Sequence, residues 1–463
     1  MTGDPAYLSI AEASALIRER KLSPLELTDA CLARIERLDG KLNAFITVTA
    51  DEARKAAREL GDEIAAGRNR GQLHGIPVGL KDIFDVAGVR TTAASPILAD
   101  NVAAADSSVT RRLKKAGAVI VGKLNLHQFA FGATGRSSHF GPPHNPWDSE
   151  RITGGSSSGS GAAVATGECF AAMGTDTGGS IRIPASLCGV TGLKPTFGRV
   201  SKAGLLPLSW SLDHAGPLTR TAEDAAIVLQ AIAGHDPADV SSSAEPVPDY
   251  AAHLRDGVAG LRIGVPDNFF FDALAPEIEA GVRAAVAVLE ALGAQVEPVH
   301  LPLMDAIPAA TNAIQLPEAL AYHQKWMGER PDAYADDVRY RLELGAMFPA
   351  VAYIQAQRLR EKAVTAWRDE VFSRVDIIAG ASTQTAAFKL DGSDLSVTLS
   401  LIRLTNPLNL LGVPAISVPC GFTADGLPFG LQLIGRWWDE ATVLRTAHAY
   451  QQATDWHTRR PRP

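Results

Sequence analysis

The sequence predicts an α/β fold in which short buried strands alternate with helices, and three observations support this. From residue 73 onward, apolar runs divided by glycine and proline recur, as at Ile76–Leu80 and Ala118–Val121. Residues 106–116, between these two runs, have helical periodicity. Such alternation is typical of layered α/β proteins. The composition, 46% hydrophobic and 21% charged over 463 residues, leaves ample chain for a large core.

Three helices are expected before this alternating region. Ser9–Glu12 is a capping-box pattern, in which the serine and the glutamate cap each other's backbone, and it opens a helix to about residue 20. Ser23–Glu26 repeats the pattern with proline at the first helical position and predicts a helix to about residue 38. Thr49–Glu52 starts an alanine-rich helix that runs to residue 67. We therefore expect an N-terminal helical layer.

The remaining chain continues the alternating pattern. Helices are expected over residues 222–233 and 277–292 and through most of 302–375, and strands over 261–265, 294–299, 376–379, 415–418 and 430–434. Ser241–Pro248, rich in serine and proline, is expected to be a surface loop.

Charge and cysteine content argue against several classes of function. A net charge of −7 and a pI of about 5.9 do not favour nucleic acid or an anionic membrane as partner. The four cysteines are far apart and form no C-x-x-C, so we expect buried thiols, with no metal site and no disulfide scaffold. We find neither a signal-peptide pattern nor ~18 uninterrupted apolar residues. The expectation is a cytoplasmic protein without a cofactor.

The most informative stretch is residues 153–192, which holds two glycine–serine clusters, Gly154–Gly161 and Gly174–Ser180. Glycine lets the backbone adopt positive φ and approach a bound group, and a serine at such a turn can act as a nucleophile. A flexible linker is the simplest alternative. Apolar segments flank both clusters, however, and charged residues crowd the second, which argues against a linker.

Three known motifs match parts of this stretch. A phosphate-binding loop requires a lysine after its second glycine, and the first lysine here is Lys194. A dinucleotide motif would need glycine at Val164, and Gly155–Gly159 satisfies the G-x-S-x-G pattern of a nucleophile elbow. The last two motifs both need a preceding buried strand, and the polar residues 148–152 do not have that pattern. None of the three is therefore favoured.

Together the motifs resemble those of the amidase signature family. The family patterns G-G-S-S-[G/S]-G and D-x-G-G-S-[I/V]-R correspond to residues 154–159 and 176–182. Further matches, which extend the resemblance over nearly the whole chain, are Gly75–Asp82, Gly122–Asn125, Phe129–Gly132, Gly192–Arg199 and Asn409–Ala415.

The resemblance implies one large domain over residues 1–463, with a central mixed β-sheet between helices. Its expected parts are N-terminal helices at about 1–70, a signature core at about 71–235 and 375–463, and a variable helical substrate-funnel region at about 236–374.

The resemblance also implies a catalytic triad: Ser180 as nucleophile, Ser156 as a bridging serine at a cis peptide bond, and Lys81 as base. A serine hydroxyl needs an adjacent base before it attacks. Lysine accepts a proton only when deprotonated, and its ordinary pKa is about 10.4. Burial lowers that pKa, and Lys81 follows an apolar strand in which burial is expected.

Other roles follow from the same resemblance. The expected oxyanion donors are the backbone N–H groups of Thr177, Gly178, Gly179 and Ser180. The expected supporting residues are Ser157, Asp176 and Arg182. The expected substrate-binding residues are Ala130, Ser156, Phe131 and Thr134. Two further aromatic residues would either line the same pocket or pack in the core: Phe129 and Trp210.

The implied function is an amidohydrolase that cleaves the C–N bond of a small-molecule amide, anilide, urea or carbamate (urethane) through an acyl-enzyme, as a monomer or homodimer. An alternative is the transamidating subunit of an aspartyl/glutamyl-tRNA amidotransferase, although Ile183 stands where such subunits usually carry glutamine. A non-catalytic protein that has kept the fold is a third hypothesis. A Ser–His–Asp triad would instead use one of His127, His139, His144 and His214.

Overall fold

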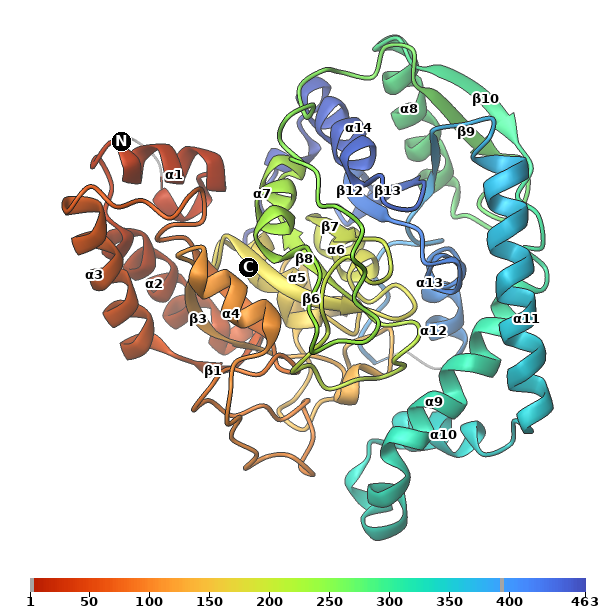
Figure 1. Ribbon diagram of the computed structural model, residues 1–463, viewed down its shortest axis with the longest axis horizontal. Helices are drawn as coiled ribbons and strands as arrows, with labels where there is room; N and C mark the ends of the chain where they lie inside the picture. The colour runs from red at the N-terminus through yellow and green to blue at the C-terminus, as the bar shows by residue number, and fades with distance from the viewer. Residues whose placement is uncertain (1–3, 392–394) are drawn as a thin grey trace.

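The computed structural model describes residues 4–391 and 395–463. In this part of the chain, eleven strands form one mixed sheet in the order β1-β3-β2-β6-β8-β7-β12-β13-β11-β9-β10, and β4 and β5 form a separate ribbon. Helices α5 and α6 pack against the sheet, as do α7, α8 and α14 (Figure 1). The predicted α/β fold, with a central mixed sheet between helices, is therefore confirmed.

The strands, in chain order, are β1 (Phe45–Val48), β2 (Pro77–Lys81), β3 (Val119–Leu124), β4 (His144–Asn145), β5 (Asp148–Ile152), β6 (Ala171–Asp176), β7 (Thr191–Lys194), β8 (His214–Thr219), β9 (Arg262–Pro266), β10 (Gln295–Val299), β11 (Ile377–Ala381), β12 (Ala415–Phe422) and β13 (Pro428–Gly435).

The α-helices are α1 (Ile10–Arg18), α2 (Pro24–Leu42), α3 (Ala50–Ala65), α4 (Ser108–Lys115), α5 (Ser158–Ala165), α6 (Arg182–Cys188), α7 (Ala222–Ile232), α8 (Pro276–Ala291), α9 (Ile307–Glu329), α10 (Asp336–Gly345), α11 (Ala350–Ala366), α12 (Leu395–Ile402), α13 (Asn406–Leu411) and α14 (Glu440–Ala453).

The N-terminal helices begin where the capping boxes predicted. The Ser9 hydroxyl accepts a hydrogen bond from the Glu12 backbone N–H, and the Glu12 carboxylate accepts one from the Ser9 N–H. Ser23 and Glu26 form the same reciprocal pair at the start of α2. Helices α1, α2 and α3 lie together at one end of the molecule (Figure 1). The expected N-terminal helical layer is confirmed.

Two neighbouring parallel strands, β2 and β6, end at the same edge of the sheet. β2 runs parallel to both β3 and β6 in the sheet. β2 ends at Lys81 and β6 ends at Asp176. The carboxyl ends of neighbouring parallel strands lie at the same edge of a sheet, which is where such folds bind ligands. The loop after β6 carries Ser180 and leads into α6.

The glycine–serine stretch is buried and is not a linker. Residues 148–152 are strand β5, contrary to the sequence-based expectation, but β5 pairs with β4 in a ribbon whose residues are largely half-buried or exposed. The ribbon therefore does not supply the buried strand that a dinucleotide motif or a nucleophile elbow needs. A side chain at Gly159 would lie 2.2 Å from the Ala44 carbonyl oxygen, so close packing requires glycine there.

Residues 302–375 are mostly helical, as predicted. Helices α9, α10 and α11 pack together and form an arm at one side of the molecule (Figure 1). Strands β9 and β10 also come from the expected funnel region, and they extend the central sheet at one edge. The boundaries of the three expected regions stay predictions. Residues 241–248 form a loop, as expected.

No helix within the described residues is both long and apolar enough to cross a membrane. The four cysteines are buried and free, as the sequence predicted; they are Cys31, Cys169, Cys188 and Cys420.

Candidate active site

A buried lysine and a serine are in direct contact at the carboxyl end of β2. The Lys81 side chain is fully buried, and its Nζ donates hydrogen bonds to Ser156 Oγ and Thr175 Oγ1, both at 2.8 Å. Ser156 lies in the turn before α5, and the Gly155–Ser156 peptide bond is cis, as the resemblance implied. Thr175, on β6, was missed in the sequence analysis, although it stands next to Asp176 in the matched motif.

Burial lowers the pKa of Lys81 to about 7, against the opposing attraction of Asp213 and Asp176. Near neutral pH a large fraction of Lys81 is therefore an uncharged amine. An uncharged amine accepts a proton from a hydroxyl, whereas an ammonium does not. The site thus contains an amine that can accept a proton near neutral pH.

Ser180 lies on the loop between β6 and α6 and is 9% exposed. The Ser157 backbone N–H donates to the Ser180 carbonyl oxygen at 3.2 Å, which joins the two glycine–serine clusters. Within the described part of the chain, the Ser180 hydroxyl makes no hydrogen bond to Ser156. Catalytic hydrogen bonds are often long in ligand-free enzymes and shorten when substrate binds.

The loop before Ser180 is held by Thr405, whose hydroxyl donates to the Gly178 carbonyl oxygen at 2.7 Å. At Gly179, φ is +130°, and a side chain would lie 2.1 Å from Thr405 Oγ1, so only glycine fits. The Gly179 N–H donates to Asp176 Oδ1 at 2.8 Å. One of the four expected oxyanion donors is therefore already used by the carboxylate that braces the loop.

Asp176 and Arg182 form a buried, bidentate ion pair beneath this loop. Arg182 Nε lies 3.0 Å from Asp176 Oδ2 and Nη2 lies 2.8 Å from Oδ1. Burial alone would raise the pKa of Asp176, but the Arg182 guanidinium and the Asn409 amide lower it well below its usual range. Arg182 also donates to Asn409 and Gln432. Both partners lie over 200 residues away, and the sequence analysis gave neither a role, although Asn409 begins the matched motif Asn409–Ala415.

Replacing Arg182 with methionine should lower the free energy of unfolding by about 3–5 kcal/mol, because the Asp176 carboxylate would stay buried without its partner. Urea denaturation measures this change. As a control, Arg283→Met removes the exposed pair with Glu279, and that change should cost at most about 1 kcal/mol. Equal effects of the two substitutions would show that the buried pair does not brace the loop.

Ser157, an expected supporting residue, contacts strand β6. Its hydroxyl donates to the Thr175 carbonyl oxygen at 3.2 Å, and the Thr175 N–H lies 3.3 Å from the same hydroxyl. Ser157 thereby joins the turn that carries Ser156 to the strand that carries Thr175.

A cavity of about 190 Å³, called here the first cavity, opens beside Ser180. Its apolar lining residues are Ala130, Phe131, Ala133, Leu208, Leu316, Leu344, Leu399 and Ile402. Its polar lining residues are Thr177, Ser180, Asn312, Gln315, Arg341, Thr398 and Asn406. The guanidinium of Arg341 is already paired with Asp337, at 2.7 Å. The first cavity is therefore mainly apolar.

The expected substrate-binding residues lie in different places. Ala130 and Phe131 line the first cavity. Thr134 is buried but is not part of that lining, and its hydroxyl accepts a hydrogen bond from the Arg136 N–H. Phe129 packs against the rings of His323, Trp326 and Tyr334. Trp210 is 64% exposed and lines a neighbouring cavity.

The histidine side chains make other contacts. His127 Nε2 lies 3.0 Å from Asp337 Oδ2, and His144 Nδ1 lies 2.7 Å from the Ser149 carbonyl oxygen. His214 Nδ1 lies 2.7 Å from the Leu212 carbonyl oxygen. The ring of His139 packs edge-on against Phe140. Among the described residues, no histidine side chain is hydrogen-bonded to Ser156 or Ser180, so a Ser–His–Asp triad is not formed.

Across residues 4–391 and 395–463, no three His, Cys, Asp or Glu side chains are grouped to hold a metal ion.

The mixed sheet carries a buried lysine–serine pair and a glycine-rich loop beside a cavity, an arrangement typical of α/β enzymes. A model of the family described as Amidase matches residues 26–444 of this chain. The chain therefore belongs to the amidase signature family.

Relatives and solved structures agree with this assignment. The A subunit of glutamyl-tRNA(Gln) amidotransferase from Moorella thermoacetica is 44% identical to the chain, over 98% of both sequences. An amidase of Pseudomonas putida is also 44% identical, over 98% of this chain and 97% of its own length. An inhibitor-bound structure, described as a vestigial protein complex that reveals the evolutionary origins of an s-triazine catabolic enzyme, superposes with a TM-score of 0.91. It is 36% identical and covers 96% of this chain and 98% of its own.

Proposed function

We propose that the chain hydrolyses the C–N bond of a small, uncharged amide through an acyl-enzyme on Ser180. The observation that carries this proposal is the contact between fully buried Lys81 and Ser156. In the proposed reaction, Ser180 Oγ attacks the carbonyl carbon, and its proton passes through Ser156 to the uncharged Lys81. The proton then returns through Ser156 to the leaving nitrogen as the C–N bond breaks. Water hydrolyses the resulting ester and releases the acid.

The backbone N–H groups of Thr177, Gly178 and Ser180 are the proposed donors to the oxyanion. Gly179 is left out because its N–H is bonded to Asp176. Preorganised donors of this kind stabilise the charge that develops on the carbonyl oxygen, and the loss of one typically costs about 10²-fold or more in rate. The proposed roles of Asp176, Arg182 and Ser157 are to hold this loop and the Ser156 turn in place.

The lining of the first cavity supports an uncharged, apolar acyl group. A buried ligand charge requires a charged partner in the site. Among the described residues that line this cavity, the one charged side chain is Arg341, which is paired with Asp337. Amides, anilides, ureas and carbamates with apolar substituents all meet this condition, because each presents the same neutral carbonyl to Ser180.

The transamidating role of an amidotransferase is the second candidate function. By name, the relatives favour it, since most of them are glutamyl-tRNA(Gln) amidotransferase proteins. A glutamine substrate would bring an α-ammonium and an α-carboxylate into the site, and the paired Arg341 offers neither group a free partner. For this reason we place the stand-alone hydrolase first.

Hydrolysis by the purified chain tests this choice. We expect the chain, without any partner, to release ammonia from benzamide faster than from glutamine at equal concentration. An assay of ammonia release, with the Ser180→Ala variant as blank, measures both. The proposal would be contradicted if benzamide were untouched while glutamine was hydrolysed, alone or after addition of the other amidotransferase subunits.

A further inference from the structure

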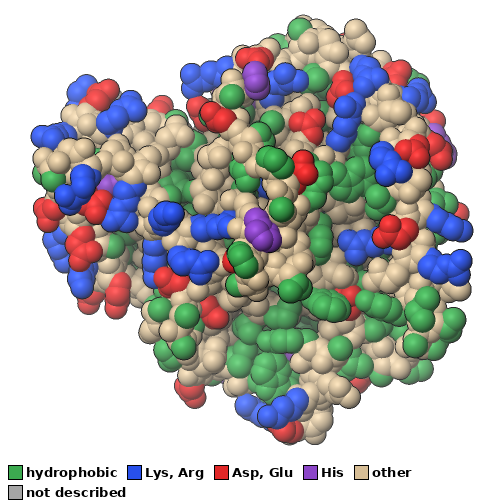
Figure 2. Space-filling model, in the orientation of Figure 1, with side chains coloured by type: hydrophobic (Ala, Val, Ile, Leu, Met, Phe, Trp, Pro, Cys, Tyr) green, Lys and Arg blue, Asp and Glu red, His purple; other side chains and the backbone are tan. Residues whose placement is uncertain are grey.

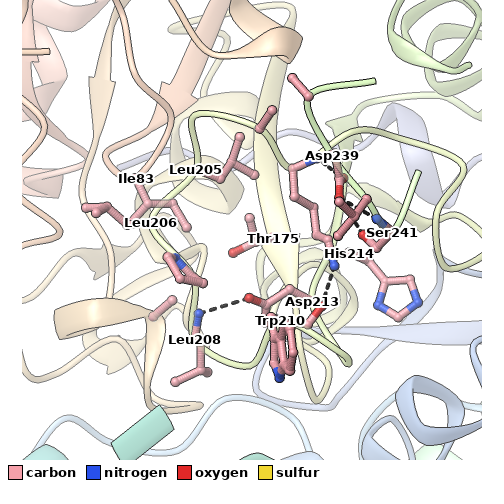
Figure 3. A pocket seen from close by; sticks show the side chains of 16 residues that line it. Ile83, Thr175, Leu205, Leu206, Leu208, Trp210, Asp213, His214, Asp239 and Ser241 are labelled. Atoms are coloured by element: carbon pink, nitrogen blue, oxygen red, sulfur yellow. Dashed lines mark hydrogen bonds between the residues drawn. The ribbon is translucent and has the colours of Figure 1, made fainter. Parts of the chain in front are cut away.

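A second cavity, of about 280 Å³, adjoins the first, and Ala130 and Leu208 line both. In Figure 3, Ile83 and Leu206 lie on one side of it, and His214 and Ser241 lie on the opposite side, with Thr175 between them. Ser180, the proposed nucleophile, lines the first cavity, and the second cavity adjoins that cavity at Ala130 and Leu208.

Thr175 connects the second cavity to the proton relay. Its hydroxyl accepts the 2.8 Å hydrogen bond from Lys81 Nζ, and the same residue lines the second cavity. In the proposed reaction, the leaving nitrogen takes its proton from the Lys81–Ser156 pair. The second cavity is lined by Thr175, which is bonded to Lys81, and we therefore place the leaving group in this cavity.

The size and walls of the second cavity fit an aromatic ring. An apolar cavity of about 150 Å³ is enough to bind benzene, so a cavity of about 280 Å³ holds a substituted ring. One side is formed by Ile83, Leu205, Leu206, Pro207 and Leu208. Outside it, an apolar groove shares Leu208 and Trp210 and continues over Pro317, Ala321 and Tyr322 on α9. Apolar side chains gather on this face of the molecule beside the helical arm (Figure 2).

The three Lys and Asp side chains among the described residues that line the second cavity are already engaged. The Asp239 carboxylate accepts hydrogen bonds from the Lys202 backbone N–H and from Ser241 Oγ, both at 2.7 Å. Lys202 Nζ donates to the Trp210 carbonyl oxygen at 2.5 Å and lies 4.3 Å from the centre of the Phe197 ring. The Asp213 carboxylate accepts hydrogen bonds from Thr177 Oγ1 at 2.6 Å and from the Leu208 N–H at 2.9 Å. A neutral leaving group therefore suits the cavity better than a charged one.

The His214 side chain lines the second cavity as a neutral group. It is 3% exposed, and its Nε2 has no hydrogen-bond partner within the described residues. Burial, the largest cause, and the neighbouring Lys194 lower the pKa of His214 well below its ordinary value, so the imidazole is neutral. Its Nδ1 lies 2.7 Å from the Leu212 carbonyl oxygen and donates to it. The neutral ring adds no charge to the cavity.

Leu208 lies between the two cavities, on a loop that is held by hydrogen bonds at two points. Asp213 fixes the Leu208 backbone, as described above. At the other end of the loop, Ser209 Oγ and Ser211 Oγ each donate to the Glu318 carboxylate on α9, at 2.7 Å. The second cavity is thus preformed.

From this geometry, we propose that the second cavity binds the aromatic amine portion of the substrate, so that the preferred substrates are N-aryl amides and N-aryl carbamates. This inference rests on the proposed function. The C–N bond breaks, the nitrogen takes the proton that returns from Lys81 through Ser156, and a neutral aromatic amine leaves through the second cavity.

The test compares benzamide with benzanilide, which share one acyl group and differ in the N-aryl ring. In the unmodified chain, kcat/KM should be higher for benzanilide. Leu206→Trp fills the second cavity and should lower kcat/KM for benzanilide about tenfold or more, with less than about a twofold change for benzamide. Leu399→Trp, in the first cavity, is the matched control and should lower both values in similar proportion.

Retained benzamide hydrolysis shows that the Leu206→Trp variant folds. Leu206→Ala gives an independent test, because a wider cavity should raise kcat/KM for N-(2-naphthyl)benzamide relative to benzanilide. Two results with benzamide hydrolysed would overturn the inference and leave the proposed function standing. One is that Leu206→Trp lowers kcat/KM equally for both substrates. The other is that the unmodified chain has a lower kcat/KM for benzanilide than for benzamide. If neither substrate is hydrolysed, both fail.

Discussion

Replacing Ser180 with alanine should lower kcat for amide hydrolysis by about 10⁴-fold or more, because the acyl-enzyme cannot form without the hydroxyl. The loss should appear in kcat rather than in substrate affinity, since the cavity walls are unchanged. Steady-state kinetics with benzamide measures the effect. A variant that kept more than about a tenth of the activity would show that another group attacks the carbonyl.

The fold of this variant should be unaffected. Within the described chain, the Ser180 hydroxyl makes no hydrogen bond, and the link to Ser157 uses the Ser180 backbone carbonyl, which alanine keeps. Urea denaturation should therefore give a free energy of unfolding within about 0.5 kcal/mol of the unmodified chain. An inactive but unfolded variant would not support the proposed role.

Replacing Lys81 with methionine should lower kcat/KM by about 10²–10⁴-fold, the range that a positioned general base contributes. Methionine fills the buried space but accepts no proton, so Ser156 loses the partner that lies 2.8 Å from its hydroxyl. Steady-state kinetics at pH 8 measures this effect, since Lys81 is mostly uncharged there in the unmodified chain.

The pH dependence separates loss of a base from loss of structure. The pKa of Lys81 is about 7, and the uncharged amine is the active form, so activity should rise as pH increases through 7 and then level off. The rise should disappear in Lys81→Met. Lys123→Met is the control: Lys123 is a buried lysine on β3 that is paired with Asp82, at 2.7 Å. Lys123→Met should lower the free energy of unfolding, but activity should still rise as pH increases through 7. A rise that persisted in Lys81→Met would exclude Lys81 as the base.

Local patterns in the sequence predicted much of the fold. The capping boxes at Ser9 and Ser23 fixed the starts of α1 and α2, because each box depends on residues three positions apart. Strand β5 was missed because its residues 148–152 are polar, and a two-stranded surface ribbon buries little apolar area. Periodicity reports on burial, so a strand outside the core carries a weak signal.

The sequence predicted some features of the candidate site and missed others. Burial of Lys81 followed from the apolar run before it, whereas the roles of Ser156 and Ser180 came from the motif match alone and stay predictions. The roles of Thr175, Asn409 and Gln432 were missed because they depend on contacts between distant segments. The engagement of the Gly179 N–H by Asp176 could not be predicted either, since it depends on how the loop curls around the carboxylate.

The most direct test of the account is the rate at which a fluorophosphonate labels Ser180 as a function of pH, with the modified residue identified by mass spectrometry. The account predicts a single adduct on Ser180, with a labelling rate that rises about tenfold per pH unit below the Lys81 pKa of about 7 and is slow and flat in Lys81→Met. An adduct on another residue, or a rate that does not change between pH 5 and pH 8 (roughly the interval in which a base with this pKa gains and loses its proton), would contradict it.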